Sequence, residues 1–296
     1  MHSTKTNPES SDGLTTSDGV SAGPPRPNAS GSAASPGPQA PLWQTEEARL
    51  LRLAAAEVRT VPRLTSRRPD TTMADAYALQ WYTASLRVDE GDRVLGYKVG
   101  LTSRAMQEQF GMDEPDSGVL LASMQVPAGG TVNHAGLLTP RVEAEVAFRL
   151  GADLRGDEVD EGDVRAVLDG VCLALEVIDC RYEPEGITLV DSVADNAACA
   201  GFVLGEFVLP GWDLRHERLS VHVDGVAMAQ GEGRDVLGDP IRSLVWLTRR
   251  LAKLGRGLRA GEVVLTGAVH ASLPLTAGQF IRVFSPNLPG VSLRVA

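Results

Sequence analysis

The sequence predicts an α+β fold, because helix-like and strand-like segments are grouped along the chain instead of alternating. Two amphipathic segments come first, and a series of short apolar runs separated by Gly, Pro and Asp turns follows. One further amphipathic segment interrupts these runs late in the chain. Regular βαβ alternation and internal repeats are not visible, so a doubly wound sheet and a repeat architecture are not favoured.

Residues 1–42 are predicted to form a disordered tail that precedes a single domain, residues 43–296. Ser, Pro and Gly make up about half of the first forty residues, and no aromatic residue occurs there. Such a stretch cannot bury enough apolar surface to offset the entropy lost on ordering. A dispensable extension is the favoured interpretation, and a docking segment for a partner is the alternative.

The bulk composition excludes several functional classes. A net charge of −10 offers no basic surface for nucleic acid or for an anionic membrane. No apolar run approaches the length of a membrane span, and the start lacks the apolar core of a signal peptide. Cys172, Cys180 and Cys199 are odd in number and lack metal-site spacing, so neither disulfides nor a zinc site are indicated. We expect a cytoplasmic protein.

Two helices are predicted at the start of the domain. After Trp43, apolar residues at helical spacing are Ala48, Leu51, Ala55 and Val58. A second helix begins at Thr72, where Asp75 completes a capping box, and it ends near Gly91. Its apolar face comprises Met73, Tyr77, Trp81, Ala84 and Val88.

Strand-like runs dominate the rest of the chain. They cover residues 94–102, 142–150, 172–180, 200–209, 219–225, 262–269, 280–285 and 291–296. A third helix is predicted at 241–255, where Gly255 ends it as a C-terminal cap would.

Two glutamates lie two residues apart in the predicted strand 142–150. Because strand side chains alternate between faces, Glu143 and Glu145 project from the same face. A solvated strand face could carry such a pair. The flanking Val and Ala residues suggest partial burial, where two close carboxylates need a cation, but for such a pair alone the solvated face is the favoured interpretation.

A third glutamate, Glu176, interrupts an apolar strand that is expected to be buried on both faces. Three carboxylates that leave room for water and a bidentate ligand suit Mg²⁺ or Mn²⁺. No His lies close to them in sequence, so zinc and iron fit less well. We therefore predict a Mg²⁺ or Mn²⁺ site formed by Glu143, Glu145 and Glu176.

Short motifs spread over the whole domain carry a family resemblance. In order they are GYKVGLT at 96–102, DEPDSG at 113–118, PRVEAE at 140–145, ALEV at 174–177, DSVADN at 191–196 and LTGA at 265–268. With them, the chain from about Glu46 to Ala296 resembles the 2-keto-4-pentenoate hydratase and 4-oxalocrotonate decarboxylase family of the fumarylacetoacetate hydrolase superfamily. The resemblance implies a mixed, rolled β-sheet with the N-terminal helices packed around it, glutamate-bound metal, and a homo-oligomer.

The resemblance also implies roles for two charged residues. Lys98 would contact the substrate carboxylate and assist proton transfer; a strand lysine between apolar neighbours could otherwise equally extend to the surface. Asp116 would act as an acid or base that helps to position water, although alone it is typical of an Asx turn. The motif at 191–196 would form a loop near the pocket, in which Asn196 is expected to be structural.

Substrate contacts are predicted for Leu101 in the first motif, and for Thr266, Gly267 and His270. A Thr-Gly pair at a strand end can offer a hydroxyl and backbone N–H groups to an anion, although a plain turn is equally compatible. The continuation Val269-His270-Ala271-Ser272 matches neither the Leu-Gly-Pro-like pattern of hydratases nor the pattern of decarboxylases. His270 could therefore contact the substrate tail, or be a hydrogen-bonded structural residue.

These assignments predict a lyase that hydrates a 2-hydroxy-2,4-dienoate to a 4-hydroxy-2-oxo acid. The metal would polarise the C2 oxygen, Lys98 would supply a proton to the far end of the diene, and Asp116 would orient water towards C4. The alternatives are decarboxylation of a 4-oxalocrotonate-type diacid, C–C hydrolysis of an acylpyruvate, and an inactive paralogue or assembly partner. The residues at 116–118 and 265–268 favour the hydratase, with a role in aromatic compound catabolism.

Overall fold

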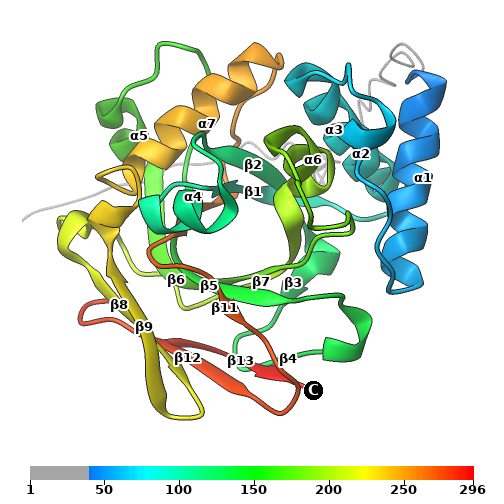
Figure 1. The fold of residues 1–296 in the computed structure, drawn as a ribbon. Coiled ribbons are helices and arrows are strands. Elements are labelled where there is room, and N and C mark those ends of the chain that lie inside the picture. Colours follow the sequence, from blue (N-terminus) through cyan, green and yellow to red (C-terminus); the bar gives the residue numbers. More distant parts are fainter. Residues whose placement is uncertain (1–39) are drawn as a thin grey trace, which may run out of the picture. The chain divides into compact units, whose positions relative to one another are not determined.

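A curled, mixed β-sheet forms the centre of the protein (Figure 1). The computed structural model describes residues 40–296, so nearly all of the predicted tail lies outside the described residues. Within 40–296, no helix has the length and apolar character that crossing a membrane requires. The α+β class and the rolled, mixed sheet expected from the sequence are confirmed.

The main sheet has the strand order β2-β1-β10-β5-β6-β7-β3, and β11 pairs with β5. Two pairs, β1 with β10 and β3 with β7, are parallel, and the others are antiparallel. The strands are β1 (Val94–Gly100), β2 (Asp116–Leu121), β3 (Gln125–Val126), β5 (Arg141–Leu150), β6 (Leu168–Ile178), β7 (Cys199–Leu204), β10 (Val263–Ala268) and β11 (Leu273–Pro274).

A smaller sheet lies beside the main one, with the order β4-β13-β12-β8-β9. Its strands are β4 (Thr131–Val132), β8 (Arg218–Val223), β9 (Val226–Glu232), β12 (Phe280–Phe284) and β13 (Val291–Val295). The two sheets share one large apolar core, to which the buried residues of β5, β6, β8, β12 and β13 all contribute.

Helices pack around the part of the main sheet that faces away from the smaller sheet (Figure 1). They are α1 (Leu42–Ala56), α2 (Leu64–Arg67), α3 (Met73–Asp89), α4 (Arg104–Phe110), α5 (Glu161–Val167), α6 (Leu189–Ala194) and α7 (Ile241–Lys253). The first three helices and α6 share a second apolar core, whereas α7 packs its buried face against β10. The capping box of Thr72 and Asp75 and the left-handed Gly255 after α7 are present as predicted.

The predicted buried face of the first helix needs correction at its end. Ala48 and Leu51 are buried, but Ala54 continues this face in place of Ala55. The helix ends at Ala56, and Val58 has a left-handed φ of 49° and is exposed. The true stripe therefore follows the helical period from Leu51 to Ala54, and the apolar Val58 lies in the turn beyond the helix.

Asn196, just before β7, contacts the edge strand β2. Its side-chain amide accepts a hydrogen bond from Val119 N at 2.8 Å and donates one to Val119 O at 3.0 Å, as a neighbouring strand would. Gly118 permits this approach, because a Cβ there would lie 2.5 Å from the backbone oxygen of Asn196. These contacts support the structural role expected for Asn196, and they hold β2 beside the segment that leads into β7.

Candidate metal and substrate site

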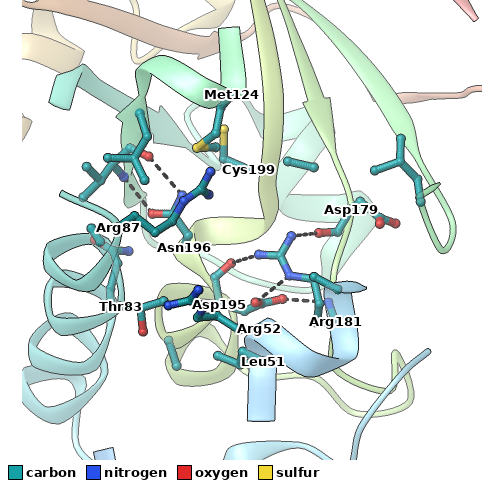
Figure 2. A pocket seen from close by; sticks show the side chains of 18 of the residues that line it. Leu51, Arg52, Thr83, Arg87, Met124, Asp179, Arg181, Asp195, Asn196 and Cys199 are labelled. Atoms are coloured by element: carbon teal, nitrogen blue, oxygen red, sulfur yellow. Dashed lines mark hydrogen bonds and ion pairs between the residues drawn. The ribbon is translucent and has the colours of Figure 1, made fainter. Parts of the chain in front are cut away.

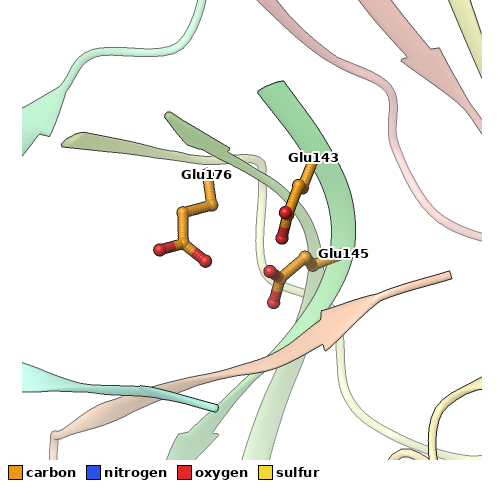
Figure 3. A group of neighbouring side chains, drawn as sticks. All are labelled: Glu143, Glu145 and Glu176. Carbon is orange, nitrogen blue, oxygen red and sulfur yellow. The ribbon is translucent and has the colours of Figure 1, made fainter. Parts of the chain in front are cut away.

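Three glutamates meet inside the roll, as Figure 3 shows. Glu143 and Glu145 project from the same face of β5, and Glu176 lies directly opposite Glu143 on the antiparallel strand β6. One carboxylate oxygen from each glutamate lies within 4.8 Å of the others. All three side chains are almost completely buried.

Most of these carboxylate oxygens lack partners. Glu145 Oε2 accepts a hydrogen bond from Gly267 N at 2.6 Å. In contrast, Glu143 Oε1, Glu145 Oε1 and both oxygens of Glu176 have no hydrogen-bond partner among the described residues. Three crowded, buried carboxylates with Lys98 as the one cation in ion-pair distance among the described residues are unfavourable, so this arrangement suits a hard divalent cation with oxygen ligands.

The pKa values of all three glutamates are raised in this metal-free structure. Burial, reinforced by the charge of Glu176, raises the pKa of Glu143 to about 8. The same two causes raise the pKa of Glu145 well above its ordinary value, and burial raises that of Glu176. Without a cation, the cluster therefore retains protons that ordinary glutamates release.

Lys98 on β1 is buried beside this cluster and does not extend to the surface. Its Nζ lies 3.5 Å from Glu176 Oε1 and 3.8 Å from Asp116 Oδ1. Burial alone would lower the pKa of Lys98, but the charges of Glu176 and Asp116 outweigh it and raise the pKa. A side chain at Gly100 would collide with both Lys98 Nζ and Asp116 Oδ1, which explains the glycine at this position.

Asp116 is the first residue of β2, a strand that the sequence did not reveal. It is buried, and its Oδ2 accepts a hydrogen bond of 2.7 Å from Ser192 Oγ on α6. Its Oδ1 has no hydrogen-bond partner among the described residues and lies nearest to Lys98. The serine thus fixes the carboxylate so that one oxygen stays available.

A cavity of about 200 Å³ opens at these residues. Lys98, Asp116, Glu143 and Ser192 contribute its polar wall, and much of the rest is apolar: Leu101, Met106, Phe110, Met112, Ile178, Pro184, Ile187, Ala197 and Ala198. Its size and its combination of charged groups with an apolar wall suit a small acid with a hydrocarbon portion.

Of the four residues predicted to contact substrate, Leu101 lines the cavity, in a left-handed conformation with φ of 56°. The other three have contacts within the protein. Thr266 Oγ1 donates to Val146 O at 2.9 Å, and Gly267 N donates to Glu145. Both ring nitrogens of His270 contact backbone: Nδ1 lies 2.7 Å from Ala271 O, and Nε2 lies 3.3 Å from Ala144 N.

Through these contacts, Thr266, Gly267 and His270 hold residues 144–146 of β5, next to the glutamates. His270 Nε2 faces the N–H between Glu143 and Glu145, and burial lowers the pKa of His270, which favours the neutral ring that this contact needs. The structure therefore associates Thr266, Gly267 and His270 with the support of β5, whereas the prediction associated them with the ligand.

The segment 196–198 separates this cavity from a second one of about 230 Å³, shown in Figure 2. Asn196, Ala197 and Ala198 have φ values of 56°, 50° and 57°. Successive left-handed residues other than glycine are strained, and such strain is often found at functional sites. Arg181 and Asp195 line the second cavity and form a buried ion pair of 2.8 Å.

Comparisons with known proteins agree with this geometry. The family described as fumarylacetoacetate hydrolase C-terminal matches residues 98–296. The 2-keto-4-pentenoate hydratase of Burkholderia vietnamiensis is 38% identical over 81% of this chain and 92% of its own. The 4-oxalocrotonate decarboxylase of Pseudomonas sp. is 37% identical over the same shares.

A solved structure shows the same architecture. The 4-oxalocrotonate decarboxylase from Pseudomonas putida G7, complexed with magnesium and adipate, superposes with a TM-score of 0.82 at 34% identity, over 86% of this chain and 97% of that one. Family match, sequence identity and fold together show that the chain belongs to the fumarylacetoacetate hydrolase family, with the 2-keto-4-pentenoate hydratases and 4-oxalocrotonate decarboxylases as its relatives.

Proposed function

We propose that this protein is a divalent-metal-dependent hydro-lyase that adds water to a 2-hydroxy-2,4-dienoate and releases a 4-hydroxy-2-oxo acid. The observation that carries the proposal is the cluster of buried, unpartnered glutamate oxygens beside the Lys98 and Asp116 pair. Several relatives at 36–38% identity are named as hydratases of 2-keto-4-pentenoate or 2-hydroxyhexa-2,4-dienoate, which supports this reaction.

Glu143, Glu145 and Glu176 would hold the metal, and we propose Mg²⁺ or Mn²⁺ because the donors are all hard oxygens. A solved relative is complexed with magnesium, and fumarylpyruvate hydrolase from Pseudomonas aeruginosa, which shares the fold, is in complex with Mn²⁺ and pyruvate. The bound cation supplies Lewis-acid polarisation of the substrate oxygen at C2.

Lys98 is the proton donor in this proposal. Its proton is held mainly by the charges of Glu176 and Asp116, because burial by itself favours the neutral amine. Once a cation offsets the negative charge of the glutamates, burial favours release of the proton to the terminal carbon of the dienol. The neutral amine then takes up the proton that the 2-hydroxy group loses, so the substrate becomes an α,β-unsaturated ketone that is open to water at C4.

Asp116 positions the water that attacks C4. Ser192 fixes Oδ2, so the unpartnered Oδ1 can accept a hydrogen bond from water that approaches through the cavity. The carboxylate can take the proton that water loses and return it to C3, and the protonated Lys98, 3.8 Å away, stabilises the charges that arise in between. Leu101 and Met106 contribute to the apolar wall beside these groups.

Decarboxylation of a 4-oxalocrotonate-type diacid is the second candidate, because the solved structure with a TM-score of 0.82 is a decarboxylase. Both reactions need the same polarised C2 oxygen, and they differ in whether carbon dioxide leaves or water adds. An assembly of several copies is also proposed, and the apparent mass in light scattering would measure it.

An ultraviolet assay with freshly generated 2-hydroxypenta-2,4-dienoate tests the proposal. We expect loss of dienol absorbance that requires Mg²⁺ or Mn²⁺, is abolished by EDTA and yields 4-hydroxy-2-oxopentanoate. Glu176→Ala should be inactive, whereas Glu158→Ala, which removes an exposed glutamate, should retain full activity.

Release of carbon dioxide from 2-oxohex-3-enedioate without hydration of the dienoate would establish the decarboxylase instead. A protein that catalyses neither reaction, and that Mg²⁺ with oxalate does not stabilise against heat, would be an inactive paralogue.

A further inference from the structure

Helix α3 reaches the site through one buried amide. Gln80 lies on the buried, mainly apolar face of α3, and its exposed fraction is 6%. Its Nε2 donates two hydrogen bonds, one to Ser117 O at 2.7 Å and one to Val193 O at 2.9 Å. A buried amide on such a face is unfavourable without partners, so these two contacts are what retains a glutamine at this position.

The two acceptors lie directly beside Asp116 and Ser192 in the chain. Ser117 follows Asp116 in β2, and Val193 follows Ser192 in α6. Ser192 Oγ donates to Asp116 Oδ2 at 2.7 Å, so β2 and α6 are joined twice, once by this hydrogen bond and once by the amide of Gln80. The glutamine therefore helps to set the separation of the two backbone segments that the contact between Ser192 and Asp116 requires.

The short helix α6 is held from outside near both of its ends. It has six residues, and the carbonyl groups in the last turn of a helix lack partners within the helix. Val193 belongs to that turn, and Gln80 donates to its carbonyl. In the first turn of α6, Asp191 accepts from Thr65 N at 2.8 Å and from Thr65 Oγ1 at 2.7 Å. Because Thr65 lies on α2, both anchors come from the N-terminal helices.

The N-terminal helices α1–α3 precede residues 98–296, the part of the chain that the fumarylacetoacetate hydrolase C-terminal family matches. The three glutamates lie within the matched part, on β5 and β6, and have no hydrogen bond or ion pair with α1–α3 among the described residues. These helices therefore act on the elements that carry Asp116 and Ser192, whereas the main sheet positions the glutamates.

We propose that Gln80 is a positioning residue, which keeps Ser192 hydrogen-bonded to Asp116 and so keeps Asp116 Oδ1 available to water. This inference rests on the proposed function, in which Asp116 orients the water that attacks C4. Without the amide, β2 and α6 are free to separate, and the carboxylate can turn away from the water position. The metal site should persist, because Gln80 makes no hydrogen bond to β5 or β6 within residues 40–296.

Gln80→Met tests the inference, because methionine fills a similar space and has no N–H group to donate. We expect kcat to fall about tenfold, the scale of one lost hydrogen bond to a charged group, with the Mg²⁺ concentration for half activity unchanged. Steady-state kinetics in whichever metal-dependent reaction the unaltered protein catalyses measure both quantities. Gln230→Met, at an exposed position of β9, is the matched control and should leave both unchanged.

A double variant separates positioning from a general loosening of the fold. If Gln80 acts through Ser192, the combination of Gln80→Met with Ser192→Ala should lower kcat about tenfold, as each single change does, whereas independent effects would multiply to about a hundredfold. Gln80→Asn keeps a buried amide with a shorter reach, so its kcat should lie between those of Gln80→Met and the unaltered protein. A crystal structure of Gln80→Met should show the hydrogen bond between Ser192 and Asp116 lengthened or broken.

Full kcat in folded Gln80→Met would overturn the inference, as would multiplied losses in the double variant or a loss of Mg²⁺ affinity as large as the loss of kcat. If Gln80→Met does not fold, Gln80→Asn takes its place, and full kcat in that variant has the same meaning. Failure of the proposed function is separate, because an unaltered protein that catalyses neither reaction reports it. The crystal structure of the Gln80 variant then still decides the inference, since an intact hydrogen bond between Ser192 and Asp116 would contradict it.

Discussion

Two clusters of buried charge lie on either side of segment 196–198, and they differ in how they are satisfied. Around Arg181, every contact is made within the protein: Nε and the backbone N donate to Asp195 at 2.8 and 2.7 Å, Nη1 donates to Asp179 O, and Nη2 donates to Asp195 O (Figure 2). The glutamate cluster instead has several oxygens without partners.

The difference separates charge that stabilises the fold from charge that is available for chemistry. A buried ion pair with complete hydrogen bonding can be tolerated or favourable, and removal of one partner exposes the other to a strong penalty. Crowded carboxylates without partners destabilise the protein unless a ligand binds. Mutations in the Arg181 cluster should therefore lower the stability of the protein, whereas mutations in the glutamate cluster should lower its activity.

The largest expected effect is on activity at the glutamate cluster. Glu145→Gln should reduce kcat/KM by about 10³-fold, the scale of losing a principal electrostatic group in a catalytic site. The metal-free variant should melt at the same or a higher temperature than the unaltered protein, because one of three crowded carboxylates is gone. Steady-state kinetics and thermal denaturation with EDTA measure the two effects, with Glu158→Gln as control. A large loss of stability would contradict the comparison.

The Arg181 cluster should show the opposite pattern. Asp195→Ala leaves the buried guanidinium without its partner and should lower the free energy of unfolding by about 3 kcal/mol or more. Urea denaturation measures this change, and Asp157→Ala at an exposed position provides the control. An unchanged midpoint for Asp195→Ala would remove the distinction between the clusters.

The sequence predicted the elements whose signals are local. The capping box at Thr72 and Asp75 and the strand-like runs are patterns of neighbouring residues, and the structure has them. The strand β2 was missed because Asp116-Ser117-Gly118 is typical of a turn, and it is a strand only through pairing with β1. β9 was missed because its outer face is largely exposed and its sequence lacks clear alternation.

The site could be predicted to the same degree. Glu143, Glu145 and Glu176 were recognisable because each interrupts an apolar run, and burial makes a carboxylate there anomalous. Arg141 belongs to the motif at 140–145, but its orientation towards the cavity could not be predicted. Its orientation depends on Ser272, which is 131 residues away in sequence and lies on another segment.

The pH dependence of stability should differ between the metal-free and the metal-bound protein. The pKa of Glu143 is raised from its ordinary 4.5 to about 8, so the metal-free fold binds a proton that the unfolded chain has lost. Its stability is therefore complete below the ordinary value and falls as pH rises towards 8, by about 1.4 kcal/mol per pH unit for one proton.

Mg²⁺ should reverse this trend, because it needs the deprotonated carboxylates that higher pH supplies. Thermal denaturation at pH 6, 7 and 8 should show a midpoint that falls with pH in EDTA, and an increasing stabilisation by Mg²⁺. Equal stabilisation at all three values would argue against proton displacement at the cluster. Glu145→Gln provides the control, since its response to Mg²⁺ should be small throughout.

The smallest expected effect concerns the hydroxyl that holds Asp116. Ser192→Ala removes the hydrogen bond to Asp116 Oδ2, so the carboxylate can turn away from the water position while the glutamates keep their geometry. We expect kcat to fall about tenfold, the scale of one lost hydrogen bond to a charged group, with little change in the Mg²⁺ concentration needed for half activity. Ser192→Thr should restore most of kcat because it keeps the hydroxyl. A loss of Mg²⁺ affinity that matches the loss of kcat would show that Ser192 supports the glutamate cluster itself, and the two parts of the site would then act as one.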